Sequence, residues 1–98
     1  MKAAFVFHPD VEGDVDEGYD WYERRRTGLG EDFLAAVEEV YARLQMNPQA
    51  HPRIYREVRR ASARRFPYGI FYRLHADRIE ILAVQHSRQD ASRWQSRA

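Results

Sequence analysis

Apolar residues recur along the chain at two different spacings, one typical of strands and one typical of helices. The first apolar run, Ala3–Phe7, places Phe5 and Phe7 on one side of an extended segment and smaller residues on the other. Pro9 follows shortly after this run. The pattern predicts a short strand over Ala3–Phe7.

Two amphipathic helices are predicted next. The first runs from about Pro9 to Arg26, with Asp10, Glu12 and Asp14 near its start and arginines at its end, as the helix dipole favours. The second runs from Leu29 to about Met46 and has the most regular apolar stripe in the chain: Leu29, Phe33, Leu34, Val37, Val40, Tyr41 and Leu44. Gly28 is able to adopt the left-handed conformation that ends a helix, and the short link implies an antiparallel hairpin.

The second half of the chain is predicted to form strands. Asn47–Arg53 contains two prolines and is predicted to be a loop without internal structure. Beyond it, alternating side chains and turn residues predict consecutive strands over Ile54–Arg60, Ala63–Phe66, Tyr68–His75 and Arg78–Gln85. A single helical turn is predicted over Ala91–Trp94.

Together these elements predict an α+β fold for a single domain spanning residues 1–98. A strand and an antiparallel helical hairpin are followed by three to four antiparallel strands, which form one sheet with both helices on one face. The residues expected to be mostly buried are Phe5, Leu29, Phe33, Val37, Val40, Leu44, Ile70, Tyr72, Ile79 and Ile81. The opposite face of the sheet would expose arginines and aromatic side chains unless a partner covered it.

Cysteine content and hydropathy narrow the class of protein. The chain has no cysteine, so it has neither disulfides nor a thiolate metal site, and this composition suits a reducing cytosol. No apolar run approaches the roughly 20 residues of a membrane span, and the N-terminus lacks the pattern of a signal peptide. We therefore expect a cytoplasmic protein that uses neither a metal nor a cofactor and has no membrane partner.

Charge is distributed unevenly although the net charge is only +1. Residues 1–52 carry a formal charge of −6 and residues 53–98 a charge of +7, and every basic residue except Lys2 is an arginine. The second half supplies a cationic set: Arg56, Arg59, Arg60, Arg64, Arg65 and Arg73. Three interpretations remain open for this set, namely a nucleic-acid surface, an acceptor for an acidic protein segment, and a solvated sheet face.

Cleavage of RNA would require more than these arginines. Arginine stabilises a developing negative charge, but its pKa above about 12 prevents it from acting as a base at neutral pH. Proton transfer would fall to His75, His86, Glu57 or Glu80. His86 is the best placed, because Arg88 follows two residues later and both could reach one phosphate. The alternative is a histidine that only forms hydrogen bonds at a strand end.

Two stretches and one later residue carry a resemblance to a known family. The run Arg64–Arg73 (RRFPYGIFYR), the run Ile79–Arg88 and the late Trp94 stand in the order seen in the RelE/ParE superfamily of bacterial toxins, which the chain resembles over nearly its full length. RelE-like members cut mRNA on the ribosome, whereas ParE-like members inhibit DNA gyrase by binding. The nuclease branch tends to have a basic residue directly after the strand tyrosine, but here Gly69 follows Tyr68. Trp94 also stands where that branch has an ionisable aromatic residue, so the resemblance is closer to the ParE-like branch.

The resemblance implies a toxin of a type II toxin–antitoxin (plasmid stabilisation) system that inhibits gyrase by binding. The second-ranked function is a ribosome-dependent mRNA endonuclease, and the third is a non-toxic interaction domain. An enzyme would use Arg65, Arg73, His86 and Arg88. The partner implied is a cognate antitoxin whose disordered C-terminal segment folds against the basic half, with Arg59, Tyr68, Phe71 and Trp94 as the binding residues.

Overall fold

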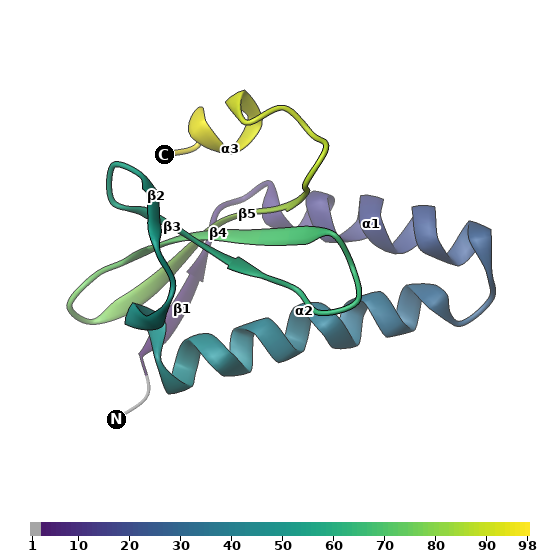
Figure 1. The fold of residues 1–98 in the computed structure, drawn as a ribbon, viewed down its shortest axis with the longest axis horizontal. Coiled ribbons are helices and arrows are strands. Elements are labelled where there is room, and N and C mark those ends of the chain that lie inside the picture. Colours follow the sequence, from purple (N-terminus) through teal and green to yellow (C-terminus); the bar gives the residue numbers. More distant parts are fainter. Residues whose placement is uncertain (1–2) are drawn as a thin grey trace.

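A mixed five-stranded sheet and a long helical hairpin dominate the computed structural model, which describes residues 3–98 (Figure 1). The elements are, in chain order, β1 Ala4–Phe7, α1 Val11–Arg25, α2 Leu29–Met46, a 3₁₀ turn Pro48–Ala50, β2 Arg53–Tyr55, β3 Val58–Ser62, β4 Tyr68–Leu74, β5 Arg78–His86 and α3 Ser92–Gln95. The strand order is β1-β5-β4-β3-β2, with antiparallel pairing from β2 to β5. The predicted α+β class and order of elements are confirmed. The sequence did not indicate that β1 joins β5 in parallel.

The helical hairpin closes as the sequence indicated. Gly28 has a φ of 93°, the left-handed conformation that glycine adopts at no steric cost. The Glu23 carboxylate accepts hydrogen bonds from the N–H groups of Gly28 (3.1 Å) and Gly30 (2.9 Å), which satisfies donors that the start of α2 leaves without helical partners. The prediction that α1 begins at Pro9 is wrong by two residues, since the helix begins at Val11.

The predicted strand Ile54–Arg60 is wrong, because the chain reverses in its middle. Tyr55 pairs with Val58 across a tight turn, so the segment forms the separate strands β2 and β3. The turn consists of Arg56 and Glu57, and Arg56 takes a φ of 53°. Neither residue type marks a turn in a sequence, which explains why the hairpin was not predicted.

The predicted strand Ala63–Phe66 is also wrong, since this segment is the loop between β3 and β4. The side chain of Phe66 is buried, and its ring packs edge-on against Tyr22 at 4.8 Å and Phe33 at 5.7 Å. The apolar residue that suggested a strand therefore anchors a loop to the helical hairpin. The region predicted to lack structure between α2 and β2 contains the 3₁₀ turn Pro48–Ala50.

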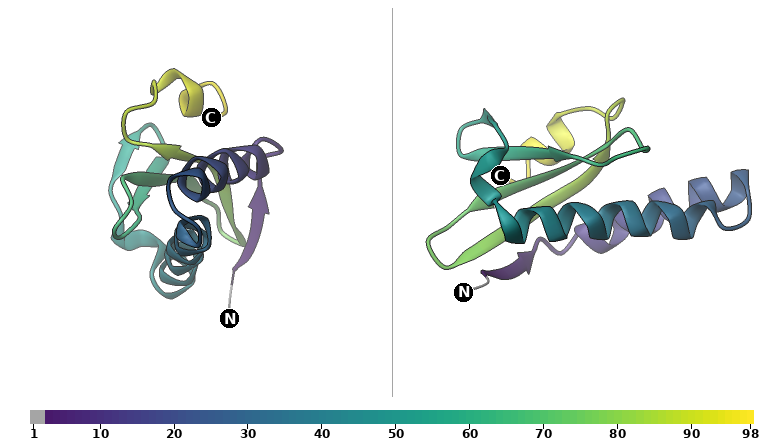
Figure 2. Two further views of the ribbon diagram at one scale, coloured as in Figure 1. Left: turned by 90° about the vertical axis from the view of Figure 1, so that its right-hand side faces the viewer. Right: turned by 60° about the horizontal axis from the view of Figure 1, so that its bottom comes forward.

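The main core lies between the hairpin and one face of the sheet, and Figure 2 shows both helices on that face. Of the residues predicted to be buried, only Phe5 and Leu29 are partly exposed. The two helices approach closely at Gly18, where a Cβ atom would lie 2.6 Å from the Phe33 ring. A larger residue at position 18 would push the helices apart.

The opposite face is covered by the chain itself, which corrects the prediction of an open aromatic surface. The C-terminal segment crosses this face (Figure 1). Trp94 of α3 stacks on Phe71 of β4 with ring centres 4.6 Å apart and an interplanar angle of 13°. Around this pair lies a second, smaller cluster of Val58, Phe71, Leu82, Ala83 and Trp94, with Tyr55 packed against it. We call this side the α3 face.

A buried ion pair attaches the C-terminal segment to α1. Arg97 donates to both carboxylate oxygens of Asp14, at 2.6 and 3.0 Å, and to the carbonyl of Leu82 at 3.1 Å. Asp14 also accepts the backbone N–H of Val84 at 3.0 Å. Leu82 is the extra residue of a β-bulge in β5, so Asp14 satisfies a backbone donor next to an irregular part of the ladder.

Candidate functional site

The four residues predicted to be catalytic do not meet in one site. His86 pairs with Tyr68 across β4 and β5, and their rings meet edge-on at 5.2 Å, which places His86 on the hairpin side of the sheet. Its Nδ1 accepts the N–H of Arg88 at 3.0 Å, and its backbone N–H donates to Gln89 at 2.8 Å. His86 therefore has the hydrogen-bonded strand-end position that was the alternative to a catalytic role.

Arg73 lies at the other end of the same strand pair and on the α3 face. It pairs with Glu80, five residues along β4 from the Tyr68–His86 pair, a separation of roughly 17 Å at about 3.4 Å per residue. Its guanidinium donates to both oxygens of Glu80 at 3.1 and 3.2 Å, and His75 Nε2 lies 2.8 Å from the same carboxylate. The hydrogen bonds from Arg73, ahead of those from His75, lower the pKa of Glu80 below its usual value.

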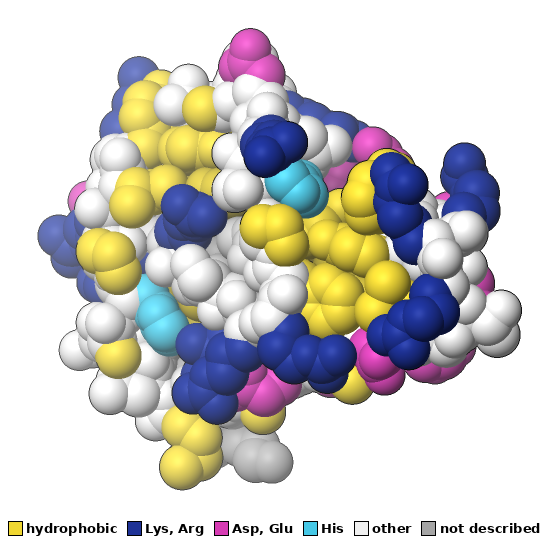
Figure 3. All heavy atoms as spheres, turned by 45° about the vertical axis from the view of Figure 1, so that its right-hand side comes forward, with side chains coloured by type: hydrophobic (Ala, Val, Ile, Leu, Met, Phe, Trp, Pro, Cys, Tyr) yellow, Lys and Arg dark blue, Asp and Glu magenta, His cyan; other side chains and the backbone are white. Residues whose placement is uncertain are grey.

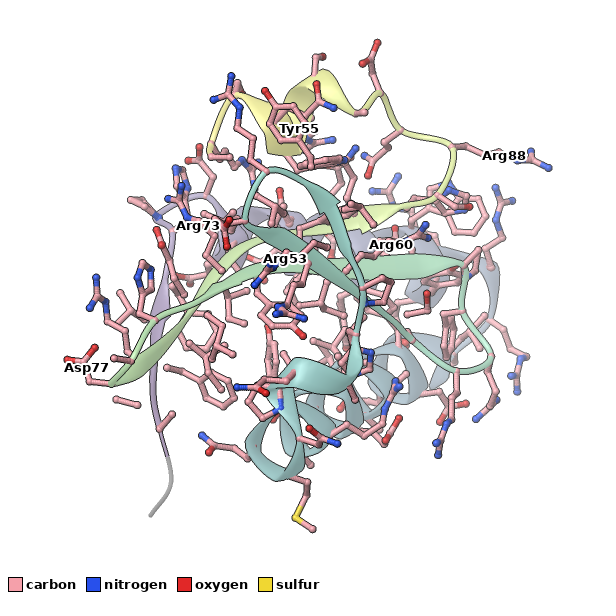
Figure 4. The ribbon with its side chains drawn as sticks, turned by 60° about the vertical axis from the view of Figure 1, so that its left-hand side comes forward. Arg53, Tyr55, Arg60, Arg73, Asp77 and Arg88 are labelled. Carbon is pink, nitrogen blue, oxygen red and sulfur yellow. The ribbon has the colours of Figure 1, made fainter. Side chains whose placement is uncertain are left out.

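The remaining two predicted catalytic arginines are at the surface. Arg65 lies in the loop between β3 and β4 with a φ of 71°, and its guanidinium is 3.8 Å from the Asp32 carboxylate. Arg88 is exposed in the segment between β5 and α3, and in Figure 4 its side chain extends away from the rest of the chain. Neither contacts Arg73 or Glu80.

Three of the four residues predicted to bind a partner pack inside the chain. Tyr68, Phe71 and Trp94 are only 8%, 6% and 6% exposed. Burial raises the pKa of Tyr68 to about 12, because the ionised phenolate would lose hydration. Arg59 is partly exposed and donates to the carbonyl of His51 at 2.7 Å, which holds the turn after α2 against the sheet.

The face shown in Figure 3 has no continuous basic site. Its arginines are separated by hydrophobic patches and acidic side chains. A pocket of about 480 Å³ lies between β1 and the hairpin, and none of the predicted catalytic residues lines it. Its lining consists mainly of Phe7, Val11, Val15, Leu34 and Tyr41.

The described residues contain no cluster of three or more metal-ligating side chains, and none of their helices is long and apolar enough to cross a membrane.

A second pocket lies on the α3 face, and the sequence did not indicate it. We call it the α3 pocket. It has a volume of about 320 Å³, and its walls are formed by Ile54, Arg60, Phe71, Gln85, His86, Ser87, Gln89, Ala91 and Trp94. Figure 4 shows Arg60 on the side of the sheet that the C-terminal segment covers. These residues come from β2, β3, β4, β5 and the C-terminal segment, so no local motif could have revealed the pocket.

Known proteins resemble the chain over most of its length. The family model described as "ParE toxin of type II toxin-antitoxin system, parDE" matches residues 5–91. The chain is 27% identical over 91 residues to Toxin ParE2 of Mycobacterium tuberculosis, in strain CDC 1551 / Oshkosh and in strain H37Rv, an alignment that covers 92% of this chain and 87% of that protein. A solved structure, "Chromosomal ParDE TA system from P. aeruginosa", shares the fold with a TM-score of 0.65 at 21% identity, covering 87% of this chain and 96% of that one.

Proposed function

The chain belongs to the ParE toxin family of type II toxin–antitoxin systems, and we propose that it inhibits DNA gyrase by binding rather than by cutting RNA. The observation that carries this proposal is the separation of His86 from Arg73. They lie roughly 17 Å apart along the sheet and on opposite faces, so one phosphodiester cannot contact both. General acid–base catalysis needs the proton-transferring group within hydrogen-bonding reach of the reacting atoms.

One cluster favours the runner-up, a ribosome-dependent mRNA endonuclease. His75, Glu80 and Arg73 lie together, and a histidine oriented by a carboxylate is a common general base. However, the single Glu80 carboxylate engages both Arg73 and His75, which leaves Arg73 less available for a phosphate. This arrangement is more typical of a structural ion-pair network.

The two mechanisms are separated by assaying the purified protein, free of antitoxin, on both targets. We expect dose-dependent loss of gyrase supercoiling activity and no cleavage of mRNA on programmed ribosomes. His75→Ala serves as the control for the cluster that favours the nuclease. Ribosome-dependent cleavage that disappears in His75→Ala or His86→Ala, with gyrase unaffected, would establish the nuclease and contradict the proposal.

The partner of a toxin in this family is a cognate antitoxin. We propose that the C-terminal segment of this antitoxin docks on residues 53–98, in the cytoplasm, where gyrase also acts. The charge of +7 on this half supports an acidic partner segment, and Ile54, which is 43% exposed, provides an apolar contact beside it. Because Tyr68, Phe71 and Trp94 are buried, the exposed arginines of this half are expected to make the first contacts.

Co-expression with the neighbouring gene, followed by hydrogen exchange of the complex, tests the position of the interface. We expect new protection of backbone amides within residues 53–98. Protection confined to the pocket between β1 and the hairpin, which has the acidic residues Glu12, Asp16 and Glu38 among its lining, would contradict the proposed surface.

A further inference from the structure

The α3 pocket combines an apolar wall with buried polar groups that lack partners. Its volume of about 320 Å³ is at the lower end of the range of about 300–1,000 Å³ that is typical of small-ligand sites. Ile54, Phe71 and Trp94 form the apolar wall, while Arg60 and Gln85 supply the polar groups.

Gln85 presents a free hydrogen-bond acceptor. Its side chain is 3% exposed, and its Nε2 donates to the carbonyl of Asp90 at 2.8 Å. This bond fixes the orientation of the amide, because only the nitrogen can donate to a carbonyl. The buried Oε1 then has no hydrogen-bond partner among residues 3–98. An unpaired buried acceptor destabilises a fold unless a ligand or water satisfies it.

Arg60 presents a free donor beside this acceptor. Its Nε is also buried without a hydrogen-bond partner, and within residues 3–98 its guanidinium has no carboxylate partner in a salt bridge. The side chain lies over Gly69, where a Cβ atom would be only 2.5 Å from Nε. Gly69 is the direct cross-strand neighbour of Gln85. The missing side chain at position 69 therefore leaves room for Arg60, which lines the α3 pocket together with Gln85.

We propose that the α3 pocket binds a nucleobase. The pocket requires a ligand with an acceptor for Arg60 and a nearby donor for Gln85 Oε1, and the edge of a nucleobase carries both in one plane. The flat apolar faces of a base suit the wall of Ile54 and Trp94. Arg88 follows Ser87 of the pocket wall and extends into solvent, where it is available to the phosphate of a nucleotide (Figure 4). The base could belong to a free nucleotide or to single-stranded nucleic acid.

Titration with adenosine 5′-monophosphate, followed by ¹⁵N NMR, tests the site directly. The exposed Trp21 is replaced by Phe, so that the one remaining indole N–H signal reports on Trp94. We expect shifts of this signal and of the Gln85 side-chain amide. Ribose 5-phosphate, which has no base, and purine riboside 5′-monophosphate, which lacks the amino donor, are each expected to bind at least about tenfold more weakly.

Several outcomes of this titration would overturn the proposal. Equal affinity for ribose 5-phosphate would show that the arginines bind any phosphate. Shifts of the same signals with N-methylacetamide but not with the nucleotide would assign the pocket to a peptide amide of a protein partner. An absence of shifts at millimolar nucleotide would show that water satisfies the two polar groups.

Two variants test the residues assigned to the site. Arg60→Met keeps the aliphatic stem over Gly69 but removes the donors, and Gly69→Ala keeps the donors but displaces the arginine. Each is expected to weaken nucleotide binding at least about tenfold. Arg78→Met, at the far end of β5, is the matched control and is expected to change affinity less than about twofold. Undiminished binding in either folded variant would contradict the assignment.

The source of the base is decided by comparing the mononucleotide with a five-residue oligoadenylate. Tighter binding of the oligonucleotide, with an affinity that falls steeply with salt, would support the site and identify single-stranded nucleic acid as the ligand. Tighter binding of the mononucleotide would support the site and identify a free nucleotide.

Discussion

The main core on the hairpin side of the sheet is a broad cluster of aliphatic and aromatic side chains, whereas the α3 face has only a small aromatic cluster, which lies near Arg60, Gln85 and the ion pair of the C-terminal segment with Asp14. The first region has a core wide enough to hold the fold together without specific polar contacts. The second depends on individual pairs such as Asp14–Arg97 and Trp94–Phe71. Substitutions on the hairpin side are therefore expected mainly to lower the stability of the fold, whereas substitutions on the α3 face are expected mainly to change binding.

The largest effect on stability is expected on the hairpin side. Phe33 is fully buried between α1, α2 and the sheet, and Phe33→Ala is expected to lower the free energy of unfolding by about 3–5 kcal/mol. Chemical denaturation measures this change. Trp21→Ala, an aromatic substitution on the same hairpin at a side chain that is 48% exposed, is the control and is expected to cost less than about 1 kcal/mol. Similar costs for the two variants would contradict the comparison.

The next effect is expected at the buried ion pair. Asp14→Asn removes the negative charge that pairs with Arg97, and the largely buried guanidinium is left without that charged partner. The free energy of unfolding is therefore expected to fall by about 3 kcal/mol. The matched control is Glu17→Gln, because the Glu17–Arg93 pair is also close, at 2.9 Å, but exposed, and it is expected to cost less than about 1 kcal/mol. If both variants lost the same small amount, the polar attachment of the C-terminal segment would not be stabilising.

Trp94→Ala is expected to release α3 with a smaller loss of global stability. The cost is expected to be about 2 kcal/mol, below the usual 3–5 kcal/mol for a core aromatic, since the short segment detaches and both surfaces become hydrated. Hydrogen exchange should then speed up in Ser92–Gln95 while amides of α2 stay protected. Equal acceleration in α2 would show that the two faces unfold as one unit.

The smallest effect is a dependence on pH at Glu80. Hydrogen bonds from Arg73 lower the folded-state pKa of Glu80. The ionised carboxylate therefore stabilises the fold fully above the unfolded-state pKa of about 4.5, and this stabilisation is lost as pH falls through the folded-state pKa. Glu80→Gln is therefore expected to lower the free energy of unfolding by about 1 kcal/mol at pH 7, with the difference shrinking below about pH 4. Denaturation of both proteins across this range measures it, and a difference that persisted at acid pH would have another cause.

The sequence predicted the hairpin side far better than the α3 face, for physical reasons. The stripe of α2 repeats over several turns, so one substitution hardly disturbs the pattern. By contrast, the β2–β3 turn uses Arg56 and Glu57, which carry no turn signal, and the bulge at Leu82 shifts the alternation of β5 by one residue.

The predicted site residues illustrate a further limit of sequence. Asp14 was predicted only as a favourable charge at the start of a helix, yet it binds Arg97, 83 positions away in the chain. Arg60 and Gln85 line the same pocket although they are 25 positions apart in the chain, and Gly69, the cross-strand neighbour of Gln85, leaves the space that Arg60 occupies. Contacts between residues so far apart depend on strand register, which periodicity alone does not determine.

The dose response of His86→Ala against DNA gyrase tests the proposed binding mechanism most directly. His86 lies on the hairpin side, away from Arg73 and Glu80, so the substitution is expected to change the inhibitory concentration by less than about threefold. General acid–base catalysis typically contributes about 10²–10⁴-fold. A loss of toxicity of that size in a variant that still folds and still binds its antitoxin would contradict a mechanism based on binding.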